Sequence, residues 1–254
     1  MIDAHAHLTD RRFAADVGAV LERARKVGIA RILTAAEDVE SSVRALALAR
    51  EHHEIRVAVG VHPHRATSWT DATAERLAEL ARDERVVAVG EIGLDFSGRS
   101  APPEEQERAF RAQLALASAL RLPVVVHVRD SGRRTRELLA GAIWRGMLHC
   151  YSEGGVEVPE WTALGLHLSF AGTLTYPGNQ ALREAARAVP AERLLAETDA
   201  PYLAPQNVRG QRNEPRYVAA TYAMLAHERE AEFASLVARI DENARELFGE
   251  RWGT

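Results

Sequence analysis

The sequence has 254 residues, of which 46% are hydrophobic and 27% are charged. That composition is typical of a globular protein and excludes a disordered or fibrous chain. The 32 basic and 36 acidic side chains give a net charge of −4, which argues against a protein that coats nucleic acid. No apolar run has the roughly 18 residues of a membrane span, and the first residues do not resemble a secretory leader. We therefore expect a cytoplasmic, monomeric protein without membrane partners.

Short runs rich in Val, Ile and Leu alternate with longer amphipathic segments along the whole chain. The runs predict eight strands, over residues 2–8, 31–35, 56–61, 86–92, 124–128, 146–150, 166–170 and 194–198. Helical periodicity is clear at residues 13–27 and 104–120, and two more helices are expected within residues 214–248.

This alternation predicts the fold class. Strands that alternate with helices pair in parallel through right-handed crossovers, and eight such units in about 250 residues match an α/β protein of the (β/α)8 TIM-barrel type. We expect residues 1–254 to form a single barrel domain. A doubly wound open sheet is the alternative, because sequence periodicity does not reveal whether a sheet closes.

Histidines and carboxylates gather where the predicted strands end. Six of the ten histidines stand there, together with two acidic residues: His5, His7, His62, His64, His127, His149, Glu91 and Asp199. The carboxyl ends of barrel strands converge on one face, where active sites are built. A buried carboxylate is costly unless a cation or a metal compensates its charge, and these strand ends carry no lysine. The pattern therefore indicates a bound metal.

Six of these residues are more ligands than one tetrahedral ion needs. In a strand, His5 and His7 point to the same side, roughly 6.6–6.8 Å apart, so that both can bind one ion. We expect two divalent ions that share Glu91 as a bridge. One ion takes His5, His7, Glu91 and Asp199, and the other takes Glu91, His127 and His149. Mixed imidazole and carboxylate ligands accept Zn, Mn or, less comfortably, Mg, so the metal remains open.

Eight motifs in order resemble one family, the TatD-type metal-dependent deoxyribonucleases of the amidohydrolase superfamily. They are DAHAHL (3–8), VGVHPH (59–64), GEIGLD (90–95), PVVVHVRD (123–130), HCYS (149–152), SFAGTLT (169–175), ETDAPYLAP (197–205) and RNEP (212–215). The resemblance spans the chain and implies a TIM-type barrel with one to three divalent ions. It also implies phosphodiester hydrolysis, typically as a 3′–5′ DNA exonuclease, with the same six residues as ligands. His62 or His64 would then face the substrate phosphate.

Catalytic roles follow from what phosphodiester cleavage needs, namely a nucleophile, charge compensation and a proton for the leaving group. We assign Glu91 as the bridge and Asp199 as general base, with a pure ligand role as the alternative for Asp199. His62 and His64 are candidates for substrate contact or the leaving-group acid, and for a structural role in their loop.

Three further residues are candidate substrate contacts. Asp95 could instead cap its loop, Arg129 could instead pair with Asp130, and Glu197 could instead support a metal ligand.

Other residues receive weaker expectations. Strand alternation would turn Cys150 away from His149, and Trp69 could stack on a terminal base. Arg99, Arg209 and Arg212 lie on predicted loops and could contact outer phosphates. The overall prediction is a metal-dependent hydrolase that trims single-stranded or frayed DNA ends. The alternative is a D-aminoacyl-tRNA deacylase, an activity that the resemblance ascribes to a similar branch of the family.

Overall fold

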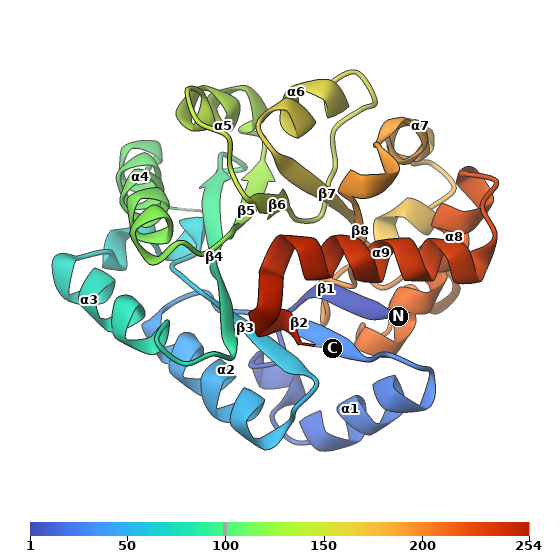
Figure 1. Ribbon diagram of the computed structural model, residues 1–254, viewed down its shortest axis with the longest axis horizontal. Helices are drawn as coiled ribbons and strands as arrows, with labels where there is room; N and C mark the ends of the chain where they lie inside the picture. The colour runs from blue at the N-terminus through green and yellow to red at the C-terminus, as the bar shows by residue number, and fades with distance from the viewer. Residues whose placement is uncertain (99–100, 254) are drawn as a thin grey trace.

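A computed structural model of the chain describes residues 1–98 and 101–253, and in that part the strands form one parallel sheet in sequential order (Figure 1). The strands are β1 (Ile2–Ala6), β2 (Arg31–Ala35), β3 (Ile55–Val59), β4 (Val86–Asp95), β5 (Val124–Arg129), β6 (Gly146–Leu148), β7 (Leu166–Phe170) and β8 (Leu194–Ala196). A parallel bridge between Ala6 and Ala200 brings β1 against the segment after β8. The predicted (β/α)8 barrel is confirmed.

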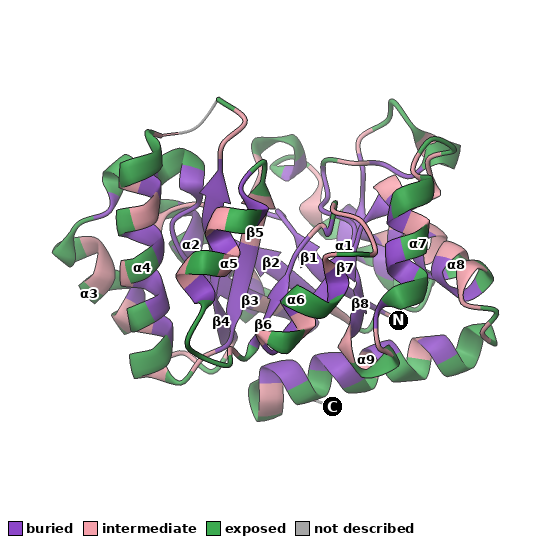
Figure 2. Cartoon of the chain, turned by 90° about the horizontal axis from the view of Figure 1, so that it is seen from above, coloured by how far each residue is buried: buried purple, intermediate pink, exposed green. Residues whose placement is uncertain are grey.

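Helices surround the sheet on its outer side (Figure 1). They are α1 (Val17–Lys26), α2 (Val39–Glu51), α3 (Asp71–Leu80), α4 (Pro103–Leu120), α5 (Gly132–Leu139), α6 (Val158–Ala163), α7 (Gln180–Ala188), α8 (Val218–Glu228) and α9 (Phe233–Phe248). Helix α9 lies across the amino-terminal end of the barrel (Figure 2), where Asn243 donates a hydrogen bond to the carbonyl of Leu194. Among the described residues, no helix is long and apolar enough to cross a membrane.

Strand ends differ from the prediction where the chain turns into the site. Strands β6 and β8 each end two residues earlier than expected, and β4 continues three residues further, to Asp95. Cys150 and Asp199, just beyond the two shortened strands, have φ angles of 47° and 55°. A left-handed residue cannot continue a strand, so local backbone geometry overrides the β propensity at these positions.

Two glycines allow β4 and β5 to approach closely. A Cβ atom on Gly90 would lie 2.6 Å from Cβ of Val125, and one on Gly93 would lie 2.0 Å from the carbonyl oxygen of His127. Gly93 also has a φ of +142°, which side chains rarely tolerate. Gly93 pairs in register with His127 of β5, and the side chain of Glu91, two residues earlier on β4, reaches His127, with Oε1 2.7 Å from Nδ1.

Candidate metal centre

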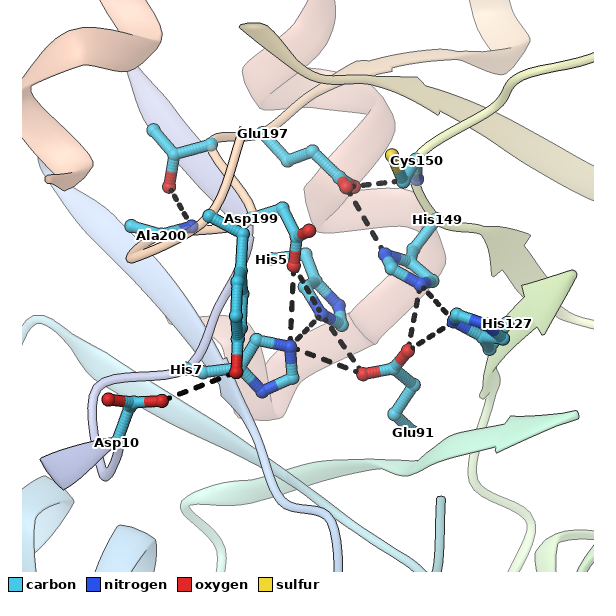
Figure 3. A network of polar contacts seen from close by, with 12 residues as sticks. His5, His7, Asp10, Glu91, His127, His149, Cys150, Glu197, Asp199 and Ala200 are labelled. Carbon is cyan, nitrogen blue, oxygen red and sulfur yellow. Dashed lines mark hydrogen bonds and ion pairs between the residues drawn. The ribbon is translucent and has the colours of Figure 1, made fainter. Parts of the chain in front are cut away.

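Glu91 stands at the middle of the polar cluster and is almost fully buried, with 1% of its surface exposed. Its Oε2 atom lies 3.3 Å from Nε2 of His5 and 3.4 Å from Nε2 of His7. Its Oε1 atom lies 2.7 Å from Nδ1 of His127 and 2.8 Å from Nε2 of His149. Oε2 therefore faces His5 and His7, and Oε1 faces His127 and His149 (Figure 3), with Nε2 of His62 as a third imidazole contact of Oε1 at 3.3 Å.

Asp199 completes the cluster on the side of His5 and His7. Its Oδ1 atom lies 3.7 Å from Nε2 of His5 and 3.3 Å from Nε2 of His7. The structure thus gathers all six predicted ligands at one place. Their convergence fits the strand placement, in which β1 and the segment after β8 are neighbours.

Two residues that the sequence analysis did not consider as site residues hold the loop of Asp199 in place. Asp3 accepts hydrogen bonds from the amide and the hydroxyl of Thr198, at 2.8 and 2.6 Å. Asn213 donates to the carbonyls of Thr198 and Tyr202, at 2.8 and 2.6 Å. Both stand within quoted motifs, DAHAHL and RNEP, but their long-range partners are visible only in the fold.

Within residues 1–98 and 101–253, three groups of side chains have ligand atoms close enough together to hold an ion. They are His5, His7 and Asp199; His5, Glu91 and His149; and His62, Glu91 and His127. The grouping differs from the predicted one because His5 stacks on His149, with ring centroids 4.0 Å apart, and so belongs to both sides. His62 enters the third group, although the sequence analysis placed it on the substrate side.

The hydrogen bonds of His62 fix its tautomer. Its Nδ1 atom accepts the backbone amide of His64 at 3.1 Å, so the proton of the neutral ring is on Nε2. Nε2 lies 3.3 Å from Oε1 of Glu91. Burial lowers the pKa of His62 to about 4, which keeps the ring neutral. A neutral ring with its proton on Nε2 is a hydrogen-bond donor rather than a ligand at that atom.

The carboxylates and histidines of the cluster shift one another's pKa values. Burial alone would raise the pKa of Glu91, but the surrounding histidines, His149 first, hold it well below its usual value. Burial likewise opposes protonation of His7, yet the carboxylates of Asp199 and Glu91 raise its pKa to about 9. The same two effects compete at His149, and Glu91 raises its pKa well above the ordinary value. The two carboxylates therefore attract positive charge to these nitrogens.

The donor set suits divalent cations. Nε2 of His5 and Nε2 of His7 face each other at 3.2 Å, next to oxygens of Glu91 and Asp199. Oε2 of Glu91 and Nε2 of His127 are buried without a hydrogen-bond partner in the described part of the chain. Imidazole nitrogens and carboxylate oxygens that converge at such spacing are the ligands Zn and Mn prefer.

Asp95 and His64 form the outer edge of the cluster. Asp95 lies at the end of β4 and contacts Nε2 of His64 at 2.9 Å and Nε2 of His127 at 3.4 Å. It also accepts hydrogen bonds from Ser97, so it caps its loop as well as supporting the two histidines. The side chain of His64 is 45% exposed, whereas that of His62 is 8% exposed.

Glu197 lies behind His149 and not in the open part of the site. Its Oε1 atom accepts the amide of Cys150 at 2.9 Å and lies 3.3 Å from Nδ1 of His149 (Figure 3). The contact orients the His149 ring so that Nε2 points at Glu91. Of the two predicted positions, the structure places Glu197 in the supporting one.

The expectation for Cys150 is wrong. Strand β6 ends at Leu148, so strand alternation no longer applies at Cys150, and its positive φ turns the residue toward the cavity that His149 also lines. The expectation for Trp69 is also wrong, since its side chain is 5% exposed and packs in the core. A buried indole has no face for a base.

Arginines on the loops have different environments. Arg129 is exposed at the end of β5, lines the cavity beside His127, and makes no ion pair within the described residues. Arg212 is bound to Asp16 at 2.8 Å and to Glu214 at 3.1 Å, which opposes a role in phosphate contact. Arg209 stacks over Tyr176, with 4.4 Å to the ring centroid. Arg99 lies outside the described residues.

Comparison with known proteins identifies the family. The family model described as TatD related DNase matches residues 2–249. The chain therefore belongs to the TatD related DNase family. A relative named 3′-5′ ssDNA/RNA exonuclease TatD, from Klebsiella pneumoniae (strain 342), is 40% identical, with 98% of each chain covered. The metal-dependent hydrolase YabD of Bacillus subtilis (strain 168), named as uncharacterized, is 34% identical, again with 98% of each chain covered.

A solved structure extends the similarity to three dimensions. The TatD homologue YJJV of Escherichia coli K12 superposes with a TM-score of 0.92 at 31% sequence identity, covering 98% of this chain and 97% of the other. The eight-stranded barrel is therefore the fold of this TatD family member throughout its described length.

Proposed function

We propose that this TatD family member is a divalent-metal-dependent hydrolase that removes nucleotides from the 3′ end of single-stranded DNA. The observation that carries the proposal is the position of Glu91, whose two oxygens face separate sets of imidazoles. Two bound divalent ions, of which Zn, Mn and Mg are the candidates, would supply charge for the phosphoryl oxygens and lower the pKa of an attacking water. His5, His7, Glu91, His127, His149 and Asp199 would hold them.

Asp199 is our candidate for the general base. Its carboxylate lies at the edge of the cluster, with its side chain 12% exposed, and so is accessible from the cavity that it lines. Burial opposes ionisation, but the hydrogen bond from His7 lowers the pKa of Asp199 below its usual value. The ionised carboxylate can orient an attacking water and accept its proton.

The histidines of the VGVHPH motif differ in what they can do. His62 presents an Nε2–H donor inside the site, because its Nδ1 atom is occupied by the His64 amide. We assign to His62 the contact with the substrate phosphate or its leaving oxygen. His64 stands further out, against Asp95, and we assign to it a supporting contact near the entry.

The charge distribution of the protein favours binding of a DNA strand end over binding along a long stretch of DNA. The chain has a net charge of −4, and Arg129 is an exposed cation beside the cluster with no carboxylate partner among the described residues. The affinity of a protein with few phosphate contacts depends only weakly on salt. On single strands, the logarithm of the binding constant falls by roughly 0.7 per contact for each tenfold rise in salt concentration. We propose one to three such contacts, which suits a strand end and opposes tight binding to duplex DNA.

The deacylase alternative uses the same side chains on a carboxylic ester. The two relatives described above carry exonuclease and hydrolase names, and neither name mentions an aminoacyl ester. The nuclease proposal is therefore favoured.

The decisive experiment incubates metal-loaded protein with linear single-stranded DNA, its closed circular form and D-aminoacyl-tRNA in parallel. We expect the linear strand to lose nucleotides one at a time from its 3′ end, with the circle intact, and chelation to abolish the reaction. Rapid cutting of the circle would replace the end-specific proposal by an endonuclease. Deacylation without strand shortening would refute the nuclease proposal.

A further inference from the structure

A cavity of about 530 Å³ opens beside the metal centre on the side of β5 to β8. His127, His149 and Asp199 line it where it meets the cluster. Its other lining residues come from the end of β5, from the loops after β6, β7 and β8 and from the first turn of α7: Val128, Arg129, Cys150, Ser152, Thr173, Gly178, Asn179, Ala181, Leu182, Tyr202 and Leu203. A space of this size lies within the roughly 300–1,000 Å³ of pockets that enclose a small organic ligand.

One wall of the cavity is apolar. Ala181 and Leu182 contribute it from α7, and Leu203 contributes from the loop after β8. Tyr202 lies next to Leu203, with its ring 5.8 Å from the ring of His7 in an edge-on arrangement. An apolar wall offers a phosphate no hydrogen-bond donor or positive charge, but it can pack against the face of a nucleobase.

Polar side chains also line this cavity, among them Arg129, Ser152 and Asn179. The Nδ2 atom of Asn179 donates to the carbonyl of Thr173 at 2.9 Å, which leaves its Oδ1 atom available as an acceptor. Arg129 supplies a positive charge, and among the described residues no carboxylate pairs with it. The cavity thus combines a cation at the end of β5 with apolar lining residues from α7 and the loop after β8.

We propose that this cavity seats the terminal nucleoside of the strand. The base lies against Ala181, Leu182 and Leu203, the sugar lies near Tyr202, and Arg129 contacts the phosphate at the cluster. The inference rests on the proposed function and adds to it where the released nucleotide binds. The first turn of α7 bounds one side of the cavity, and we infer that this favours a nucleotide at the end of a chain over a continuous strand.

The test fills the cavity with a larger side chain and leaves the proposed metal-ligating residues unchanged. Ala181 is exposed on α7 and lines the cavity, so Ala181→Trp places an indole in the space proposed for the base. Ala188 is an exposed alanine at the other end of the same helix, away from the cavity, and Ala188→Trp is the matched control. Circular dichroism and the melting temperature establish that both variants fold.

Calorimetric titration of the metal-loaded proteins then uses three probes: deoxyadenosine 5′-monophosphate, deoxyribose 5-phosphate and inorganic phosphate. We expect the wild type to bind the nucleotide at least tenfold more tightly than the sugar phosphate. Ala181→Trp should remove that difference and change the affinity for inorganic phosphate less than twofold, whereas Ala188→Trp should change neither.

Arg129→Ala separates the two ends of the proposed ligand. It should weaken binding of all three probes and reduce the salt dependence of DNA binding by about one contact. Arg133→Ala, an arginine whose side chain is 91% exposed and pairs with Glu137, is its control and should leave all three affinities unchanged.

Two results would overturn the inference. One is equal affinity of the wild type for nucleotide and sugar phosphate, and the other is unchanged nucleotide binding by folded Ala181→Trp. If either occurred while the wild type still shortened linear DNA, the cavity assignment would fail and the nuclease proposal would stand. Failure of the wild type to shorten DNA would instead count against the proposed function.

Discussion

The two ends of the barrel use charge in opposite ways. At the carboxyl end, the buried charges of Glu91 and Asp199 face imidazoles at 2.7–3.7 Å. At the amino end, which α9 covers in Figure 2, arginines contact backbone carbonyls. Arg56 donates to the carbonyl of Arg251 at 2.6 Å, and Arg251 donates to that of Val86 at 2.9 Å.

The difference separates stability from function. A guanidinium bound to carbonyls has its hydrogen bonds satisfied by the fold itself and ties the last residues of the chain to β3 and β4. A carboxylate set among histidines has partners whose charge depends on protonation, and it keeps free lone pairs for a cation. Changes at the carboxyl end should therefore alter turnover, and changes at the amino end should alter the free energy of unfolding.

The largest effect is expected for Glu91→Gln. The amide removes the negative charge that both imidazole pairs face, so metal content should fall and turnover on single-stranded DNA should drop by at least 100-fold. The measurements are single-turnover kinetics and metal analysis of the purified variant. Near wild-type turnover in a folded, metal-loaded variant would refute the bridging role.

The matched control is Glu54→Gln at the amino end. Glu54 is also buried, at 3% exposed, but its partners are Arg25 and the exposed His53, which lie outside the polar cluster. Because Arg25 is partly in water, the loss should cost about 1 kcal/mol of unfolding free energy and leave turnover unchanged. Loss of turnover in this variant would show that the two ends are not independent.

The second effect concerns the close contact of β4 with β5. Gly93→Ala places a methyl group 2.0 Å from the carbonyl of His127 at a φ of +142°. We expect a loss of roughly 3 kcal/mol or more in unfolding free energy, together with weaker metal binding. Chemical denaturation with and without metal measures both.

Gly28→Ala is the control for the cost of placing an alanine at a positive φ. Gly28 has a φ of +82°, but no atom lies within 4 Å of the place that its added methyl group would occupy, so only conformational strain applies. We expect a loss of about 1 kcal/mol in unfolding free energy and unchanged metal binding. Equal losses in the two glycine variants would mean that the contact with β5 does not position the site.

The barrel and the ligand cluster were predictable because they follow repeating rules. Eight alternating units fix the fold class, and parallel strands bring their carboxyl ends to one face, so His5, Glu91 and His149 could be placed at the same end of the barrel from their strand positions alone. Their roles as metal ligands stay predictions. The grouping of His5 with His149 needed the actual ring geometry.

Features that depend on a single turn were not predictable. Cys150 was misplaced because β6 ends two residues early at a left-handed backbone, which nothing in the local sequence marks. Trp69 was misjudged because its burial depends on distant packing. The hydrogen bonds of Asp3 and Asn213 to the loop of Asp199 join residues 11 to 195 positions apart, beyond the reach of local patterns.

The third effect uses pH away from the metal centre. His167 on β7 is 4% exposed, and its burial, with the charge of Arg193, lowers its pKa to about 4. As the pH falls, the His167 ring therefore takes up a proton near pH 6.5 in the unfolded chain but only near pH 4 in the folded chain. The free energy of unfolding decreases as the pH falls through this window. A pKa difference of this size corresponds to at most about 3 kcal/mol of unfolding free energy.

Replacing the ring should remove this part of the pH dependence. His167→Leu should lose less unfolding free energy than the wild type between pH 7 and pH 4, measured by urea denaturation without metal. His227→Leu, at an exposed histidine on α8, should follow the wild type. Identical slopes for the His167 variant and the wild type would show that the buried ring does not contribute.

The smallest effect tests the amino end directly. Arg56 makes three hydrogen bonds, to the carbonyls of Arg251, His53 and Ile55, at 2.6, 2.9 and 2.9 Å. Arg56→Ala leaves the Arg251 carbonyl able to bind water, so the expected loss is about 1 kcal/mol, seen as a lower urea midpoint with the same slope. Turnover on single-stranded DNA should stay within twofold of the wild type, because the site lies at the other end of the strands. A fall in turnover larger than the fall in folded fraction would mean that the anchoring of the carboxyl-terminal residues also shapes the metal centre, and the separation of stability from function along the barrel axis would fail.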